Sequence, residues 1–357
     1  MLAESGILPK YGFPTDLVDL HLPEMNSSIA SNRLSLSRGM RQAIREYAPG
    51  SEIVAGKTLW KSIGIKRPRG RQLETRNYGR YPSCKTFVWP IENFDSAMKC
   101  PVCGEEIHLE KRMLIPSYGF EGKKSNKGIG LRKPRSRGFS RVYFSQHWPN
   151  ETSRSVSYFA GGAVSLRYAG NGQLCVLNAP NRKFHVCDRC GAAAVGGEEL
   201  QHWEWCKRIQ NEPFIAHHDA LGASFVSDVL ELTIEINSKP NVMEEDWNSV
   251  LWTLFTAASN LLEISETELG GTMYENAQGS WSVMIYDDVP GGAGHSRWLF
   301  ENASLLFEEA YRTVDGHCGC GEETCCYGCI ANYYNQQEQT NLSRGAAKRL
   351  LGELLGR

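Results

Sequence analysis

The cysteines near the C-terminus have the residue type and spacing of a metal site. Five of the twelve cysteines lie between His317 and Cys329, as a C-x-C pair followed closely by a C-x-x-C pair. A C-x-x-C turn directs two thiolates toward one point, and a second pair nearby completes the four-thiolate tetrahedron that zinc prefers. The spacing alone permits two ligand sets, which are Cys318, Cys320, Cys326 and Cys329, or the same set with Cys325 in place of Cys326.

Disulfide bonds are the alternative explanation for such a cluster. They form in oxidising compartments, and residues 1–13 lack the basic segment and apolar core of an export signal. No apolar run approaches membrane-spanning length, so we expect a soluble, cytoplasmic protein. In that compartment, closely spaced cysteine pairs favour metal binding over cross-linking.

Two further cysteine pairs predict a second zinc ion. Each belongs to a C-x-x-C-G motif, whose glycine permits a tight turn with backbone N–H groups facing the thiolates. Two such knuckles are the halves of a zinc ribbon, although 83 residues separate these two. We therefore expect two structural zinc ions, the second of them bound by Cys100, Cys103, Cys187 and Cys190.

The remaining cysteines give weaker signals. His202 and Cys206 have the i, i+4 spacing of neighbours on a helix and could hold a third metal. A buried cysteine beside a partly buried histidine is the commoner explanation. We likewise interpret His217 and His218 as structural or exposed residues rather than as ligands.

The net charge of -1 hides a strong asymmetry. Between Lys61 and Arg141, 19 Lys and Arg residues face only 7 Asp and Glu, whereas the rest of the chain has 20 against 33. Basic residues interleaved with glycine and aromatic residues suit contacts to a phosphate backbone and stacking on unpaired bases. A solvated loop or an acidic protein partner is the alternative. The candidate DNA-binding residues are Lys66, Arg67, Arg69, Arg71, Lys123, Lys124, Lys127, Arg132, Lys133, Arg135 and Arg137.

Periodicity indicates the elements that must position these residues. Period-2 alternation predicts strands at 141–145, 155–159, 163–168, 174–177, 225–236 and 281–286, and apolar residues at helical spacing predict helices at 36–47, 244–264 and 296–313. We therefore expect an α+β fold, in which a β-rich middle domain with zinc-ribbon knuckles precedes a mixed α/β zinc-binding domain. The expected boundaries are 1–60 for a connecting segment, 61–215 for the middle domain and 216–357 for the last.

Two stretches could be mistaken for nucleotide sites. Residues 51–58 resemble a P-loop, but the first glycine is misplaced and no strand precedes it, so a hairpin turn is the better prediction. Without a P-loop, the acidic pair Asp287 and Asp288 cannot serve an ATPase. Either Asp287 caps the glycine-rich turn 290–294, or the N–H groups of that turn bind a phosphate.

The run from Tyr286 to His295, followed by a helix and the cysteine cluster, resembles the helicase-associated Mrf-type zinc-binding domain. That domain occurs at the C-terminus of bacterial DEAD/DEAH-box helicases and in the DrmB-like subunit of DISARM antiphage systems. Residues 325–336 are closer to the DrmB style, and residues 6–14 and 37–50 are similar to the segment that joins motor and zinc domain. The resemblance implies Cys326 rather than Cys325 as the ligand, and it marks as motif residues of unassigned role Asp287, Gly291, Gly292 and His295.

The resemblance also implies a function. Because the chain starts where the motor would end, we expect a separate DEAD/DEAH-box helicase subunit to supply the ATPase. The chain itself is then expected to be a non-enzymatic, zinc-stabilised, DNA-binding accessory subunit in antiphage defence or DNA repair. The alternatives are a metal-dependent nuclease that uses Asp287, Asp288 and His295, and a pure protein scaffold.

Overall fold

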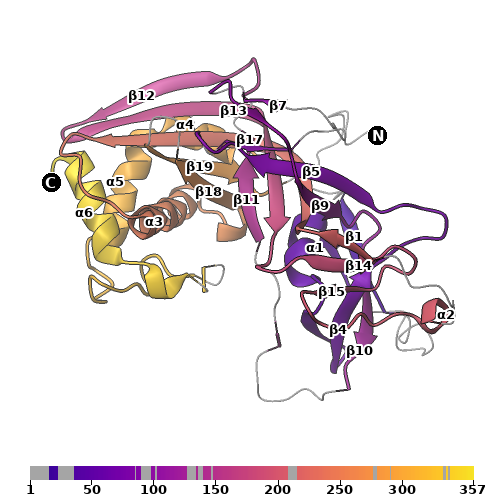
Figure 1. Cartoon of the computed structure of the whole chain (residues 1–357). Helices are drawn as coiled ribbons and strands as arrows, with labels where there is room; N and C mark the ends of the chain where they lie inside the picture. The colour runs from indigo at the N-terminus through magenta and orange to yellow at the C-terminus, as the bar shows by residue number, and fades with distance from the viewer. Residues whose placement is uncertain are drawn as a thin grey trace.

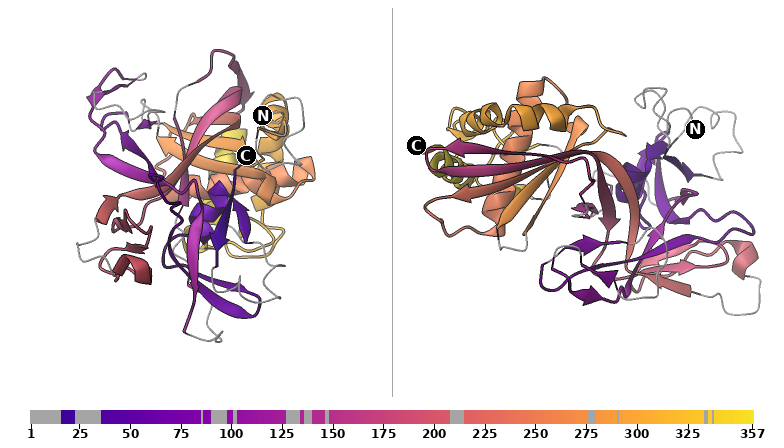
Figure 2. Two further views of the ribbon diagram at one scale, coloured as in Figure 1. Left: turned by 90° about the vertical axis from the view of Figure 1, so that its right-hand side faces the viewer. Right: turned by 90° about the horizontal axis from the view of Figure 1, so that it is seen from above.

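Two long antiparallel strands, β13 (Gly162–Asn178) and β17 (Ala220–Ile236), are the central pair of the fold (Figure 1). They pair from Gly162 opposite Ile236 to Asn178 opposite Leu221, with one irregularity between Ala169 and Gly172. The computed structural model describes residues 16–22, 36–84, 86–89, 98–100, 103–126, 134–135, 140–145, 148–207, 215–275, 280–289, 291–332, 335–336 and 338–357. The molecule has two lobes, which lie side by side in the right-hand view of Figure 2, and the two strands run through both of them.

A nine-stranded sheet grows from this pair. Its order is β11-β13-β17-β9-β5-β6, with β12 on the edge of β13, β19 on β17 and β18 on β19. The added strands are β5 (Glu74–Arg80), β6 (Phe87–Val88), β9 (Lys111–Ile115), β11 (Ser140–Phe144), β12 (Ser153–Phe159), β18 (Leu269–Glu275) and β19 (Trp281–Asp287).

Helices cover one face of this sheet at one end and make the helical lobe. They are α3 (Glu244–Leu262), α4 (His295–Glu301), α5 (Ala303–Val314) and α6 (Arg344–Leu355), with the short turns η3 (Glu266–Glu268) and η4 (Gln339–Asn341). Alternate residues of β13 and β17, such as Leu166 and Leu232, pack against Leu254, Leu306 and Leu350 of these helices in the largest apolar core. The apolar residues that recur every 3.6 residues in α3 pack in this core against those that alternate along the strands.

We call the second lobe the basic lobe, because it carries Lys66, Arg67, Arg69, Arg71, Lys123, Lys124 and Arg135. A five-stranded sheet has the order β2-β1-β10-β4-β3, and a smaller sheet has the order β15-β14-β16. Their strands are β1 (Leu17–His21), β2 (Ser37–Gly39), β3 (Glu52–Ala55), β4 (Thr58–Ile65), β10 (Phe120–Lys124), β14 (Phe184–Cys187), β15 (Ala193–Val195) and β16 (Ile215–His218). Helices α1 (Met40–Glu46) and α2 (Glu204–Lys207) and the hairpin of β7 (Met98–Lys99) and β8 (Glu106–Ile107) complete the described elements.

The predicted α+β class is confirmed. The P-loop lookalike is the β3–β4 hairpin, as expected, with Gly56 and Lys57 at its tip. The boundary expected near residue 215 does not separate two sheets, because β13 on one side of it pairs with β17 on the other. In the part of the chain that the structure describes, no helix combines the length and apolar character needed to cross a membrane.

Candidate metal centres

Four C-terminal cysteines converge in the loop after α5. The Sγ atoms of Cys318, Cys320, Cys326 and Cys329 all lie within 4.8 Å of one another. Cys320 Sγ is 3.5 Å from Cys318 Sγ and 3.8 Å from Cys329 Sγ, which in turn is 3.9 Å from Cys326 Sγ. A tetrahedral zinc ion with bonds of roughly 2.3 Å separates its sulfur ligands by about 3.8 Å. The donor set and its spacing therefore fit zinc.

The backbone of the C-x-x-C turn is arranged to support thiolates. The N–H of Cys326 donates to Cys329 Sγ at 3.2 Å, and the N–H of Gly328 donates to Cys326 Sγ at 3.3 Å. The N–H of Cys329 closes the turn on the Cys326 carbonyl at 3.0 Å. Such N–H donors stabilise negative charge on sulfur, as a metal-bound thiolate requires.

Arg344, which sequence reasoning missed, holds the loop of the cysteine cluster through hydrogen bonds. Its side chain is 5% exposed at the start of α6. It donates to the Val314 carbonyl at the end of α5 at 2.9 Å and to the Cys320 carbonyl at 3.1 Å. One buried guanidinium therefore joins two helices to the cysteine loop, a role that no local sequence pattern predicts.

Cys325 lies outside the ligand set. Its Sγ contacts the Gln339 carbonyl at 3.7 Å instead. The structure thus brings together the four cysteines that the resemblance implied.

The chain after the knuckle turns back through two reciprocal hydrogen bonds. The N–H of Asn332 donates to Asn335 Oδ1, and the N–H of Asn335 donates to Asn332 Oδ1.

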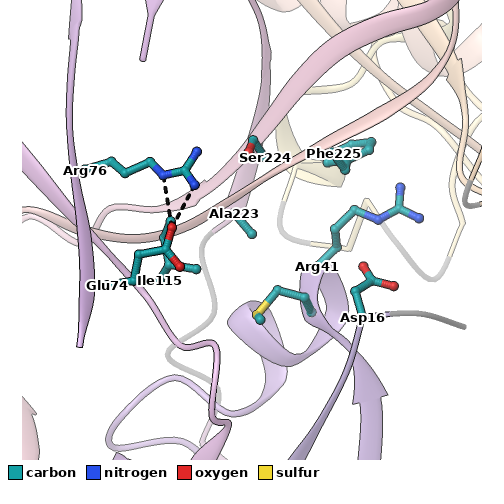
Figure 3. A pocket seen from close by; sticks show the side chains of 9 residues that line it. Asp16, Arg41, Glu74, Arg76, Ile115, Ala223, Ser224 and Phe225 are labelled. Atoms are coloured by element: carbon teal, nitrogen blue, oxygen red, sulfur yellow. Dashed lines mark hydrogen bonds and ion pairs between the residues drawn. The ribbon is translucent and has the colours of Figure 1, made fainter. Parts of the chain in front are cut away.

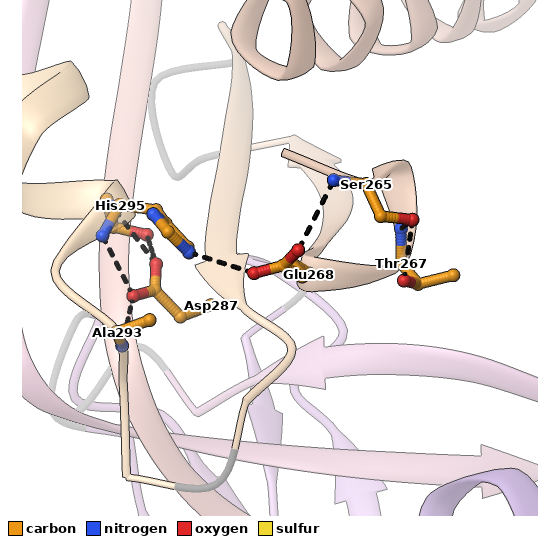
Figure 4. A network of polar contacts seen from close by, with 7 residues as sticks. Ser265, Thr267, Glu268, Asp287, Ala293 and His295 are labelled. Atoms are coloured by element: carbon orange, nitrogen blue, oxygen red, sulfur yellow. Dashed lines mark hydrogen bonds and ion pairs between the residues drawn. The ribbon is translucent and has the colours of Figure 1, made fainter. Parts of the chain in front are cut away.

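Asp287 joins the end of β19 to the glycine-rich turn and α4 (Figure 4). Its fully buried carboxylate accepts the backbone N–H groups of Ala293 at 2.6 Å and His295 at 3.1 Å on Oδ2. Oδ1 accepts the N–H and the hydroxyl of Ser296 at 2.8 and 2.6 Å. The carboxylate therefore occupies the donors that a phosphate would need, and the capping interpretation of the turn prevails over the phosphate-binding one.

The other motif residues complete this turn. Gly291 and Gly292 have positive φ, and a side chain at Gly292 would meet the Asp228 carboxyl at about 2.5 Å. Burial, reinforced by Asp287, raises the pKa of Asp228 to about 6. His295 Nε2 lies 3.5 Å from Glu268. Sequence reasoning missed Asp228, because a single aspartate in a strand carries no motif.

The arrangement does not favour a nuclease. Each Asp287 oxygen already accepts two hydrogen bonds, so neither has a lone pair directed at a metal ion. Asp288 pairs with Arg41 of α1, whose guanidinium also donates to the Asp288 carbonyl at 3.1 Å.

Residues 252–330 match the family model of the MrfA Zn-binding domain. The matched stretch contains β18, β19, the Asp287 turn and all four clustered cysteines. Residues 252–330 therefore resemble this family, and we refer to them below as the MrfA Zn-binding domain. The resemblance to Mrf-type zinc-binding domains is therefore confirmed, and the family match and the cysteine geometry together support zinc as the metal.

The chain as a whole also has relatives. It is 25% identical over 97% of its length to the Druantia protein DruE of Escherichia coli (strain UMEA 4076-1), and the match covers 21% of DruE. Crystal structures of the DUF1998 helicase MrfA, with DNA and without, match 95% and 94% of this chain and 34% of MrfA, at 12% and 10% identity and TM-scores of 0.41 and 0.38. The chain thus spans about one fifth of DruE and one third of MrfA.

These relatives correct the expectation of a non-enzymatic protein. MrfA, which gives the zinc-binding domain its name, is a helicase and hence an enzyme. In both relatives the matching sequence is part of a much longer polypeptide. The DISARM and DNA-repair parts of the expectation stay predictions.

Outside the MrfA Zn-binding domain, the two C-x-x-C-G knuckles do not share a metal site. Cys187 and Cys190 cluster with His202 and Cys206, whereas Cys100 and Cys103 cluster with Cys84. The prediction of a single zinc ribbon is therefore wrong. The physical reason is that each knuckle finds partners close in sequence, one beside β14 and the other beside β7, on separate sheets. The i, i+4 spacing of His202 and Cys206 was the signal that could have found this.

The third cluster has three members among the described residues. Cys84 Sγ lies 3.4 Å from Cys100 Sγ, and the N–H of Cys103 donates to Cys100 Sγ at 3.5 Å. Cys84 and Cys100 are buried and Cys103 is exposed. Three thiols leave one position of a zinc tetrahedron without a described cysteine or histidine ligand.

The described DNA-binding candidates lie on the basic lobe. Residues 66–71 follow β4, and β10 pairs with β4 so that Lys123 lies opposite Lys61. Arg135 lies beside β3, where its N–H donates to Glu52. Arg69, Arg71, Lys123, Lys124 and Arg135 are exposed, whereas Lys66 and Arg67 are half-buried. Lys127, Arg132, Lys133 and Arg137 lie outside the described residues.

A charged pocket lies where α1 faces β5, β9 and β17 (Figure 3). Arg41 and Arg76 line it, and Arg76 is held by Glu74 at 2.7 Å. Its volume of about 180 Å³ is below the roughly 300–1,000 Å³ of typical small-molecule sites. We therefore assign no nucleotide to it.

Proposed function

We propose that this chain is the zinc-stabilised, DNA-contacting portion of a helicase-type enzyme that acts in antiphage defence. The observation that carries the proposal is the match to DruE, an antiphage protein, over 97% of the chain, because this match includes both lobes. The MrfA Zn-binding domain at residues 252–330 supports the helicase relationship independently.

DNA contact is the role we propose for the basic lobe. Exposed cations on neighbouring elements form a surface that suits a phosphate backbone, and MrfA has been crystallised with DNA. The described contributors are Lys66, Arg67, Arg69, Arg71, Lys123, Lys124 and Arg135.

The metal in the MrfA Zn-binding domain has a structural role in this proposal. Four thiolates fill the coordination sphere of zinc, so the ion supplies folding energy and holds no water for catalysis. Buried side chains hold the segments around the metal site in place. Arg344 holds the loop to α5 and α6, and Asp287 holds the turn that joins β19 to α4.

ATP is bound elsewhere in the enzyme in this proposal. The P-loop lookalike is a hairpin, and the charged pocket is small. We propose that a DEAD/DEAH-box motor outside the sequence described here drives translocation. The long β13–β17 pair then fixes the orientation of the zinc-binding domain relative to the DNA-contacting lobe.

A phage-protection assay tests this function. Cells carrying the complete defence locus are challenged with phage, with the wild-type chain, with Cys329→Ser, or with Lys66, Arg69 and Arg71 all changed to Gln. We expect the wild-type locus to reduce plaque number. Cys329→Ser should lose that protection together with the folded protein, because zinc binding and folding are coupled. The triple variant should lose protection at a normal protein level. Cys325→Ser is the matched control and should protect. Full protection by the triple variant would contradict the proposal.

A further inference from the structure

Four metal-binding side chains meet in the basic lobe, outside the MrfA Zn-binding domain. Cys190 Sγ lies 3.4 Å from His202 Nδ1, and Cys206 Sγ lies 3.8 Å from the same nitrogen and 3.9 Å from Cys187 Sγ. Zinc bonds of roughly 2.3 Å to sulfur and 2.0–2.1 Å to nitrogen place tetrahedral ligand atoms about 3.5–3.8 Å apart. The four donors therefore have the separations of a zinc tetrahedron.

The turn that carries Cys187 and Cys190 has the backbone of a metal knuckle. The N–H of Cys187 donates to the Ala192 carbonyl at 2.8 Å, and the N–H of Gly191 donates to the Cys187 carbonyl at 2.8 Å. The Cys100 turn repeats both bonds, and its glycine, Gly104, has the same φ of 75° as Gly191. Both knuckles therefore have the turn geometry that aims two sulfur atoms at one point.

Little regular structure holds the other two ligands in place. Between β15 and the four-residue helix α2, the described residues 196–203 form neither helix nor strand. Cys206 is nevertheless 4% exposed and packs with Cys187, Cys190 and Ala192 in a small core of its own. Such a small core contributes little burial energy, and a structural metal is how proteins hold segments of this kind.

A disulfide explains these contacts less well. The Cys187–Cys206 separation of 3.9 Å is far above a bonded length of about 2.05 Å. A disulfide between Cys187 and Cys206 would also not explain why Cys190 and His202 lie beside these two cysteines.

We propose that Cys187, Cys190, His202 and Cys206 bind one zinc ion in a closed Cys3His site. This ion ties residues 196–206 to a knuckle that docks directly on β4. The N–H of Ile65 donates to the Gly191 carbonyl at 2.8 Å, and Arg67 Nη1 donates to the Arg189 carbonyl at 3.1 Å. The site is therefore structural, and it lies beneath the basic residues that follow β4.

Zinc stoichiometry of the purified full chain tests the proposal. Elemental analysis should show that Cys206→Ser loses one zinc ion per chain relative to wild type, and that Cys206→Ser with Cys329→Ser loses two. Cys175→Ser is the matched control, because Cys175 is buried but belongs to none of the three clusters. Unchanged zinc content in Cys206→Ser would overturn the proposal.

A ligand exchange keeps the test decisive if Cys206→Ser does not fold. His202→Cys retains four ligands, so it should keep the wild-type zinc content. After replacement of zinc by Co²⁺, its sulfur-to-cobalt charge-transfer absorption should exceed that of wild type by one cobalt–thiolate bond. Identical cobalt spectra for wild type and His202→Cys would show that His202 is no ligand, and the proposal would be wrong.

Discussion

At the scale of single residues, buried polar side chains organise the MrfA Zn-binding domain. Asp287 receives four hydrogen bonds and Arg344 gives two to backbone carbonyls, so each joins segments that are separate in the sequence. The sequence predicted Asp287 as a motif residue but left its role open. The structure assigns the role because it shows which donors surround the carboxylate.

Arg344→Ala should destabilise the domain. It leaves the Val314 and Cys320 carbonyls without their donor and opens a cavity under the cysteine loop, which together cost about 2–4 kcal/mol. Urea unfolding measures the loss, and a colorimetric zinc chelator should remove zinc faster from the variant. Arg349→Ala on the same helix is the control, because that side chain is 46% exposed and pairs with Asp246 at 3.6 Å. Equal effects of the two variants would contradict the role given to Arg344.

Asp228 should make stability depend on pH. It faces Asp287, His295, Tyr168 and the N–H of Gly294, and burial raises its pKa from 3.8 to about 6. A raised carboxyl pKa means that the folded state holds the proton more tightly, so stability from this group falls as pH rises from about 4 to 6 and is constant above.

Asp228→Asn removes this dependence and keeps an oxygen acceptor. Relative to wild type, the variant should gain about 1 kcal/mol of unfolding free energy between pH 5 and pH 7.5. Urea unfolding at several pH values measures the difference in unfolding free energy between the variant and wild type. Effects of pH that both proteins share, such as zinc loss, cancel in this difference. A difference that does not vary with pH would contradict the raised pKa.

At the scale of elements, the sequence predicted regular structure well where periodicity was strong. The apolar stripe at 244–264 became α3, and the alternation at 225–236 became part of β17. The helix expected at 36–47 begins only at Met40, because residues 37–39 pair with β1. The helix expected at 296–313 is divided at Asn302 into α4 and α5.

Metal pairing was predictable only where all ligands are close in sequence. Cys318 to Cys329 fall within one loop, and the structure brings together the set that the resemblance chose. The two separated knuckles were joined incorrectly, because spacing carries no information on which sheet each turn occupies. Cys84 joins Cys100 and Cys103 from the turn after β5, 16 residues before Cys100, and belongs to no C-x-x-C motif.

Docking of the knuckle on β4 gives a prediction at this scale. A Cβ added at Gly191 would lie 2.0 Å from the Ile65 carbonyl oxygen, and its φ of 75° is unfavourable for other residues. Gly191→Ala should therefore cost about 2–4 kcal/mol of unfolding free energy. Gly197→Ala is the control, because nothing lies within 4 Å of its added Cβ, and it should change stability by less than about 1 kcal/mol. Similar stability of both variants would show that the knuckle does not dock there.

At the scale of the whole molecule, the β13–β17 pair makes one body from two lobes of different character. One lobe contains the MrfA Zn-binding domain, and the other presents the described cations of the basic segment. The charge asymmetry between 61–141 and the rest of the chain was visible in the sequence. The path of two 17-residue strands through both lobes was not, because β13 contains a glycine-rich irregularity that resembles a turn.

If the basic lobe contacts DNA phosphates, as we propose, DNA affinity depends on salt concentration through these contacts. Fluorescence anisotropy with a labelled duplex compares wild type with the Lys66, Arg69 and Arg71 to Gln variant. The logarithm of the binding constant should fall with the logarithm of salt concentration, and the variant slope should be shallower by about 2–3, near 0.9 for each lost phosphate contact. Gln at Arg297, Arg312 and Arg349 removes equal charge from the helical lobe and should leave the slope unchanged. Equal slopes for wild type and the basic-lobe variant would contradict the account.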